Sequence, residues 1–433
     1  MAQHARTRRR VLKGITAAGL TAGMIGTGRA SSTTTKYVVT GRSRGRLENA
    51  GFSIVRELAD GSVSIVAGPE GQKAELDSVP GVSGVTENFE VGVAEPVDEV
   101  EPETTDDAEF TDLQWDKEIT DTFEAHEYAT GEGTRIVIAD TGVDGTHPDL
   151  EGNFNEELSV SIVDGGEIDE HIGDSGDHGT HVAGTAAASG AHGVTGTAPD
   201  AELVSVRVLG PESSTFADIL VGAEYAAQID ADVANYSLGA GPFPPEANAD
   251  GARVAVQQVM QDVARRGTVS TVAAGNAETN LQRGNACWSY EDEDGEIVEE
   301  CNKWFYLPGT VQGVMTVSAS GPGDGLSFYS NYGASAIEVG APGGGRESLE
   351  ETVIPDDLVF STEPDGTYGW KAGTSMAAPQ VAGLVGLVRE LDPGAHTNQV
   401  ENAIAHGAEP ANGRSSPEFG AGRINALNTV ERI

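Results

Sequence analysis

Residues 136–144 read Ile-Val-Ile-Ala-Asp-Thr-Gly-Val-Asp, an apolar run that stops at an acid and then turns at a glycine. An apolar run bounded by a turn signal is typical of a strand buried on both faces. Similar runs follow along the chain, at residues 203–209, 233–238, 269–273 and 314–318, and helix-like segments lie between several of them, most clearly at residues 217–229 and 251–266. This alternation predicts an α/β fold with a doubly wound, mostly parallel sheet and helices on both faces.

The acid that ends the first strand is Asp140. Functional side chains in such sheets lie beyond the carboxyl ends of the strands. A carboxylate there is costly to bury unless a charged or hydrogen-bonding group needs it, so Asp140 is a candidate partner for a histidine. A structural turn, or an acid that binds a ribose, explains Asp140 alone equally well.

Histidines open a helix of small residues at residues 177–185, Asp-His-Gly-Thr-His-Val-Ala-Gly-Thr. A neutral imidazole at that place can act as a general base. A histidine with only a structural role is the plainer alternative. The residues themselves do not choose between His178 and His181.

A serine begins a second helix at residues 373–383, Gly-Thr-Ser-Met-Ala-Ala-Pro-Gln-Val-Ala-Gly. Pro379 is tolerated near a helix start, where backbone N–H groups lack intrahelical acceptors. Those free N–H groups favour negative charge beside Ser375, which acyl transfer generates. Asn276, at the end of an apolar strand, can donate to the same charge. A capping serine and a turn-forming asparagine are the alternatives.

Together these motifs resemble the subtilisin family of serine proteases, in a haloarchaeal, halolysin-like form, and the order Asp, His, Ser is the subtilisin order. The resemblance covers residues 113–428. It implies a triad of Asp140, His178 and Ser375, with His178 preferred over His181 because the family's base is the first histidine of its motif. It also implies that Asn276 completes an oxyanion hole.

The same resemblance implies that residues 237–239 bind substrate: Ser237, Leu238 and Gly239 would border the specificity pocket and pair with an extended peptide. The expected activity is broad hydrolysis of protein and peptide substrates through an acyl-enzyme, with no cofactor for the chemistry. A structural calcium ion is possible but is not assigned, because the loop at residues 189–194 lacks the Asn-rich sequence of the family's strong calcium site; Asp149 could still be a ligand.

The N-terminal region differs from the rest of the chain. Residues 1–30 carry only basic charges and a Gly/Ala-rich apolar stretch, which predicts a signal peptide of the twin-arginine type, and therefore a secreted protein. Residues 31–94 contain short strand-like segments and fit the position of the family's propeptide, a small α+β domain acting as an intramolecular inhibitor; a permanent binding module is the alternative. Residues 95–112 carry nine acidic side chains and predict an exposed linker that holds the maturation site, and residues 113–433 form the catalytic domain.

The net charge of −42, from 68 acidic and 26 basic residues with lysine at only six positions, is typical of proteins from haloarchaea. Such self-repulsion is relieved in molar salt, where the Debye length is about 3 Å. The charge excludes a nucleic-acid partner and, after signal removal, an anionic membrane. We expect a secreted monomer.

The segment between Asn276 and Pro308 departs from the family because it is longer and holds both cysteines, Cys287 and Cys301. It predicts a small hairpin or loop. The cysteines either form a disulfide across it or remain two buried thiols.

Two other classes of protein explain single motifs. A catalytically dead binding protein would be expected to lack one of the four candidate catalytic residues. A dinucleotide-binding protein needs G-x-G-x-x-G after its first strand, and residues 140–145 do not supply it.

Overall fold

The computed structural model describes residues 34–93, 98–103, 110–210, 214–243, 251–282, 286–291, 297–302, 305–346, 355–410 and 417–433. The predicted signal peptide at residues 1–30 lies outside these residues. Side chains 93–111 and 283–304 also lie outside the description.

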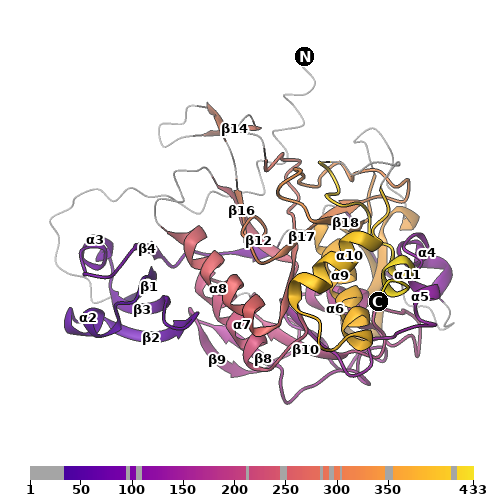
Figure 1. Cartoon of the computed structure of the whole chain (residues 1–433), viewed down its shortest axis with the longest axis horizontal. Coiled ribbons are helices and arrows are strands. Elements are labelled where there is room, and N and C mark those ends of the chain that lie inside the picture. The colour runs from indigo at the N-terminus through magenta and orange to yellow at the C-terminus, as the bar shows by residue number, and fades with distance from the viewer. Residues whose placement is uncertain are drawn as a thin grey trace.

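The core of the molecule is an eight-stranded sheet with the order β18-β17-β13-β11-β7-β10-β8-β9 (Figure 1). All neighbours are parallel except β8 and β9. The strands are β7 (Arg135–Asp140), β8 (Val160–Val163), β9 (Glu167–Glu170), β10 (Glu202–Arg207), β11 (Val233–Tyr236), β13 (Val269–Ala273), β17 (Met315–Ser320) and β18 (Val339–Pro342). The predicted mostly parallel α/β sheet is confirmed.

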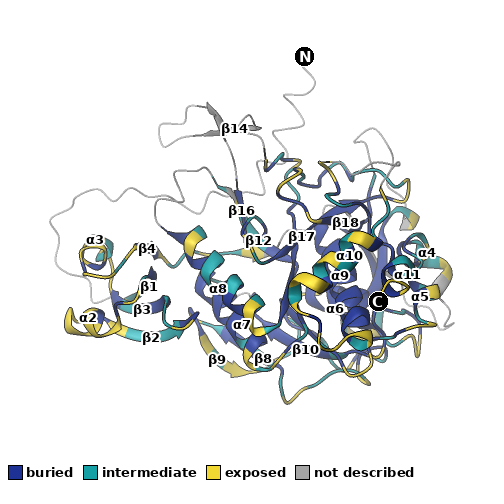
Figure 2. Cartoon of the chain, in the orientation of Figure 1, coloured by how far each residue is buried: buried dark blue, intermediate teal, exposed yellow. Residues whose placement is uncertain are grey.

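Helices cover both faces of this sheet because successive strand residues point to opposite faces and are apolar on each. Ile136 and Ile138 of β7 pack with α6 (His178–Ala187) and α9 (Thr374–Leu391). Val137 and Ala139 pack with α7 (Phe216–Gln228) and α8 (Ala252–Arg266). Figure 2 shows α6 and α9 as the buried helices, and all ten residues of α6 are buried. The remaining helices of this part are α4 (Trp115–Ile119), α5 (Thr122–Ala125), α10 (Thr397–Gly407) and α11 (Ala426–Val430).

The N-terminal unit is an antiparallel sheet with the order β2-β3-β1-β4 and two short helices. Its elements are β1 (Thr34–Thr40), α2 (Arg44–Asn49), β2 (Ser53–Leu58), β3 (Val63–Pro69), α3 (Lys73–Asp77) and β4 (Gly84–Glu87). The predicted small α+β module is present. It lies against α7 and α8, and Val38, Leu58 and Ile65 share a buried cluster with those helices (Figure 1).

Two small sheets flank the central one. In the first, β12 (Leu238–Phe243) lies between β16 (Phe305–Leu307) and β5 (Gly92–Val93). In the second, β20 (Thr367–Ala372) lies between β19 (Val359–Glu363) and β6 (Asp98–Glu103). The acidic stretch predicted as an exposed linker therefore contains a paired strand, because main-chain hydrogen bonding does not depend on the side-chain charge.

The long segment after Asn276 contains an antiparallel hairpin of β14 (Ala286–Glu291) and β15 (Ile297–Asn302), as predicted. Its register places Cys287 directly opposite Cys301. The side chains of both cysteines lie outside the described part, so the disulfide stays a prediction.

Among the helices that the structure describes, none combines the length and the apolarity needed to span a membrane.

Candidate active site

Asp140 is the last residue of β7 and is fully buried at the carboxyl end of the sheet. Its Oδ1 accepts hydrogen bonds from the backbone N–H of Thr141, at 2.8 Å, and from Nδ1 of His178, at 2.7 Å. The buried carboxylate thus has the histidine partner that its position required.

His178 is the first residue of α6, and the small residues around it let the helix start very close to the turn after β7. A Cβ atom on Gly179 would lie only 1.9 Å from the carbonyl oxygen of Gly142. Gly142 itself has a φ of +111°, in the left-handed region. Glycine is therefore required at both positions. This close approach carries the imidazole to Asp140.

The pKa of His178 is raised, as the net result of opposing influences. Burial is the largest and lowers the pKa, but attraction to Asp140 and the hydrogen bond between them outweigh it, while Lys371 opposes them. The second ring nitrogen, Nε2, is buried without a hydrogen-bond partner among the described residues. The ring is therefore oriented by one nitrogen and free at the other.

His181 has different surroundings. Its Nε2 lies 3.2 Å from the carbonyl oxygen of Val359 and 3.3 Å from that of Gly369, and burial lowers its pKa well below the ordinary value. It thus bridges α6 to β19 and β20. The structure brings His178, and not His181, to Asp140.

Ser375 is the second residue of α9 and is fully buried. Its hydroxyl donates to the carbonyl oxygen of Ser237, at 3.1 Å, and the hydroxyl of Ser237 donates to the carbonyl oxygen of Ser375, at 2.7 Å. This reciprocal pair fixes the start of α9 to the end of β11.

Asn276 lies next to the same helix start. Its Oδ1 accepts from the backbone N–H of Thr374, at 3.0 Å, and from the Thr374 hydroxyl, at 2.8 Å. The Thr374 hydroxyl in turn accepts from the N–H of Gly275, at 3.0 Å. These two hydrogen bonds from Thr374 to Oδ1 fix the orientation of the Asn276 amide. A Cβ built on Gly373 would lie 3.3 Å from the Nδ2 of this amide.

Thr374 is a residue that the sequence reasoning did not identify. No local signal points to it, since its contact partner Asn276 lies 98 positions away in the sequence. The same holds for Lys371, whose buried Nζ lies 3.2 Å from Asp177 and 3.1 Å from Glu363, beside His178.

The predicted substrate residues Ser237, Leu238 and Gly239 lie at the beginning of β12, and Ser237 precedes its first residue. In the structure this edge is occupied by β5, which follows the N-terminal unit in the chain: Leu238 pairs with Val93 and Gly239 pairs with Gly92, antiparallel.

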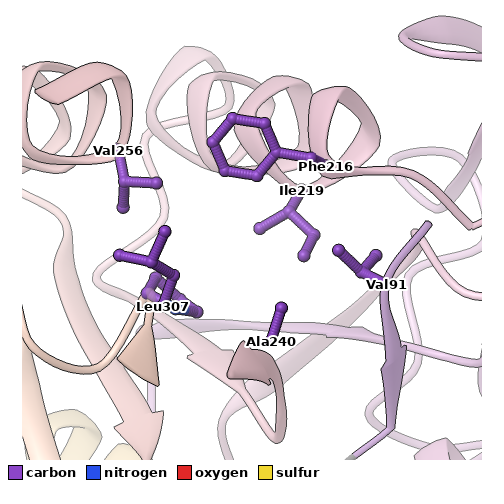
Figure 3. Close-up of a pocket in the computed structure, with 7 residues that line it drawn as sticks. Val91, Phe216, Ile219, Ala240, Val256 and Leu307 are labelled. Carbon is purple, nitrogen blue, oxygen red and sulfur yellow. The ribbon is translucent and has the colours of Figure 1, made fainter. Parts of the chain in front are cut away.

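An apolar pocket lies beside this edge, and Figure 3 shows the side chain of Val91, the residue before β5, pointing into it. Side chains of α7, α8, β12 and β16 and the proline that follows β16 form its walls: Phe216, Ile219, Ala240, Val256, Leu307 and Pro308. An extended chain pairing with β12 can therefore place an apolar side chain here.

Asp149 is held in place by protein donors. Its two carboxylate oxygens already accept from the backbone N–H groups of His192, at 2.6 Å, and Val194, at 3.0 Å, and from the Tyr368 hydroxyl, at 2.8 Å. Calcium needs six to eight oxygen ligands and free carboxylate lone pairs. Protein donors therefore hold the loop at residues 189–194.

Comparison with known proteins adds to this geometry. The family model described as "Subtilase family" matches residues 131–422. Thermitase from Thermoactinomyces vulgaris is 30% identical over 329 residues, which are 76% of this chain and 99% of thermitase. Subtilisin Savinase from Lederbergia lenta is 32% identical over 298 residues, 69% of this chain and 90% of Savinase.

Solved structures agree on the fold. The epidermin leader peptide processing serine protease of Staphylococcus aureus superposes with a TM-score of 0.72 at 20% identity, covering 92% of this chain and 98% of that one. The superposition supports the fold, whereas the matched family and the two relatives indicate the class of enzyme. The chain belongs to the subtilase family and is a subtilisin-like serine endopeptidase.

Proposed function

We propose that this chain is the precursor of a secreted, salt-adapted endopeptidase whose catalytic residues are Asp140, His178 and Ser375. The observation that carries the proposal is the 2.7 Å hydrogen bond from Nδ1 of His178 to the buried Asp140, while Nε2 has no hydrogen-bond partner within the part of the chain that the structure describes. An imidazole oriented in this way accepts a proton at Nε2 when the Ser375 hydroxyl turns from Ser237 toward it.

In the proposed reaction, the Ser375 oxygen attacks the peptide carbonyl while His178 takes its proton. His178 then returns the proton to the leaving amine, and water hydrolyses the acyl-enzyme by the same route. Asp140 holds the tautomer and stabilises the imidazolium. The reaction needs no cofactor.

The oxyanion is stabilised by Asn276 and by the backbone N–H of Ser375. The supporting observation is that Thr374 donates two hydrogen bonds to the Asn276 Oδ1, which fixes the orientation of the amide whose NH₂ group would donate to the oxyanion. A donor that is already oriented costs no reorganisation when the negative charge forms.

Recognition on the acyl side depends on main-chain pairing with β12, which tolerates many sequences and supports broad specificity. The pocket that holds Val91 adds a preference for an apolar side chain at the matching position. The charge and composition support a salt requirement, and the basic N-terminus supports export of the folded chain through the twin-arginine pathway.

Residues 31–94 are proposed as the inhibitory propeptide. The supporting observation is that Gly92 and Val93 pair with the substrate edge in the way expected of a peptide. A second contact is the Asn88 side chain, which accepts from the backbone N–H of Ala217 at the start of α7, at 2.9 Å. Maturation is self-cleavage between Val93 and Asp98, the residues that end β5 and begin β6.

The decisive test is labelling with a fluorophosphonate in molar salt, with mass-spectrometric mapping of the modified peptide. We expect label on Ser375 and loss of label in His178→Ala. The matched control is His181→Ala, which keeps all three proposed catalytic residues and should still be labelled. A folded, processed protein that takes no label would refute the catalytic assignment and favour a binding protein.

Two further measurements address the precursor and the salt requirement. Ser375→Ala should accumulate as an intact precursor, and normal trimming of that purified variant would contradict self-maturation. Dialysis into dilute buffer should abolish activity and change the circular dichroism spectrum; unchanged signals would exclude the salt adaptation.

A further inference from the structure

Arg207, the last residue of β10, is a buried cation that the proposed reaction does not use. Its side chain is 7% exposed, and its Nε has no hydrogen-bond partner among the described residues. It also takes part in none of the ion pairs within the described part of the chain. Asp140, its neighbour in register on β7, is hydrogen-bonded to His178 instead. A buried charge of this kind is costly unless an opposite charge lies beside it.

Two serine hydroxyls point to the same face of the sheet as Arg207. Ser161 of β8 is in register with Arg207, and Ser205 precedes it by two positions on β10. The alternate residues Ile162 and Val206 point to the opposite face, where they pack with α7. Both serines are buried, and neither Oγ has a hydrogen-bond partner among the described residues. Buried hydroxyls without a partner are uncommon, and two of them occur next to this guanidinium.

The segment after β9 supplies an imidazole. His171 directly follows β9, the strand that pairs with β8, and its ring lies 5.5 Å from that of Phe154 between centroids. Its buried Nε2 has no partner in the part of the chain that the structure describes. Burial lowers the pKa of His171, the positive charge of Arg207 lowers it further, and Glu156 opposes both. The imidazole is therefore neutral at neutral pH and close enough to be influenced by the guanidinium.

These groups are hydrogen-bond donors gathered around one positive charge. A guanidinium can only donate, a serine hydroxyl can donate, and a neutral imidazole donates from its protonated nitrogen. A water molecule would satisfy the hydroxyls but would leave the charge of Arg207 without compensation. An anion satisfies the donors and the charge together. The packing favours a small anion, because a Cβ built on Gly210 would lie only 2.8 Å from the Nη2 of Arg207.

We propose that Arg207, Ser161 and His171 bind a small monovalent anion, for which chloride is the natural ligand in salt solutions. The three donors come from β10, β8 and the segment after β9, so only the folded chain brings them together. Binding therefore stabilises the folded state. This effect of salt is specific to one site, unlike the screening of the net charge, and it does not depend on the proposed catalytic residues.

The test is urea unfolding of the full-length Ser375→Ala chain, which lacks the proposed nucleophile and so does not digest itself. Chloride replaces gluconate, an anion too large for the site, in steps at constant molar ionic strength. Above the dissociation constant, each tenfold rise in chloride should lower the equilibrium constant of unfolding about tenfold. An equilibrium constant that does not change with chloride would overturn the inference.

Three variants in the same background locate the effect. Arg207→Met keeps an apolar stem and removes the charge and the donors, so its unfolding should be insensitive to chloride. Ser161→Ala removes one donor and should move the dependence to higher chloride concentrations. The matched control is Arg265→Met, which removes an equal charge from an exposed side chain and should keep the full dependence. Full chloride dependence in Arg207→Met would refute the site.

Bromide replaces chloride in such sites and is located in crystals by its anomalous scattering. We expect a bromide ion between Arg207 and Ser161, which tests the site even if Arg207→Met does not fold. Bromide at this position without chloride-dependent unfolding would be an adventitious ion only and would also overturn the inference. None of these measurements uses peptidase activity, so their outcome is separate from that of the proposed function.

Discussion

Replacing Thr374 by valine tests how the donor Asn276 is oriented. Valine has nearly the same shape but lacks the hydroxyl, so one of the two hydrogen bonds to the Asn276 Oδ1 is lost while the backbone N–H of Thr374 remains. The buried N–H of Gly275 loses its acceptor in the same substitution. Two separate effects follow, one on catalysis and one on stability.

The effect on catalysis is smaller than the loss of Asn276 itself. Removing an oxyanion donor costs about a hundred- to a thousandfold in kcat, a range measured for such an asparagine in subtilisin, a relative of this chain. With half of its orientation retained, the amide keeps most of that stabilisation. We expect about a tenfold fall in kcat, which corresponds to about 1.4 kcal/mol, with KM nearly unchanged because the oxyanion forms only in the transition state.

The effect on stability comes from the unpaired N–H of Gly275. A buried donor without an acceptor costs about 1–3 kcal/mol in the free energy of unfolding. Urea unfolding in molar salt measures this cost, and the hydrolysis of a quenched peptide measures kcat and KM. Thr374→Ser, which keeps the hydroxyl, is the matched control and should retain both activity and stability.

Wild-type kcat in Thr374→Val would refute the reasoning, since the hydroxyl would then have no part in holding the donor. An equal fall in kcat for Thr374→Val in the wild type and in an Asn276→Leu background would also refute it. If the threonine acts through the amide, the two substitutions together should cost little more than Asn276→Leu alone.

Further predictions concern the pH dependence, the Asp149 loop and the apolar pocket. The base must be neutral and the pKa of His178 is raised, so kcat/KM should fall as the pH drops, with a midpoint above the ordinary histidine value of 6.5. Asp140→Asn should move that midpoint to lower pH, and an unmoved midpoint would exclude Asp140 as the cause of the raised pKa. Tyr368→Phe removes a donor to the buried Asp149 and should lower the free energy of unfolding by about 1–3 kcal/mol. The loss should be the same in buffer with a chelator and in buffer with calcium, and recovery of stability only with calcium would indicate a metal at Asp149. Val91→Asp places a charge in an apolar pocket and should shorten the lag before the precursor becomes active by about tenfold or more, and an unchanged lag would show that the pocket does not retain the N-terminal unit.

Local sequence patterns were enough to predict five of the eight strands of the central sheet, but they did not indicate β8, β9 or β18. The apolar run that forms β7 ends at an acid that is followed by a glycine turn. The runs that form β10, β11 and β13 are also short and apolar. Strands buried on both faces are continuous apolar runs, so their periodicity survives in the sequence. The strand β6 could not be predicted in this way, because its acidic residues have the composition of a linker and its pairing depends on an edge more than 260 positions away.

The same distinction between local patterns and tertiary packing applies to the candidate site. The sequence by itself determined which side chains stand where strands end and helices begin, at Asp140, His178 and Ser375, because these positions follow from local apolar patterns and small residues. Only the tertiary structure decided that His178 rather than His181 meets Asp140, that Thr374 holds Asn276, and that protein donors satisfy Asp149. The physical reason is distance along the chain. Local patterns fix the conformation of neighbouring residues, whereas hydrogen bonds between residues tens to hundreds of positions apart depend on how the finished elements pack.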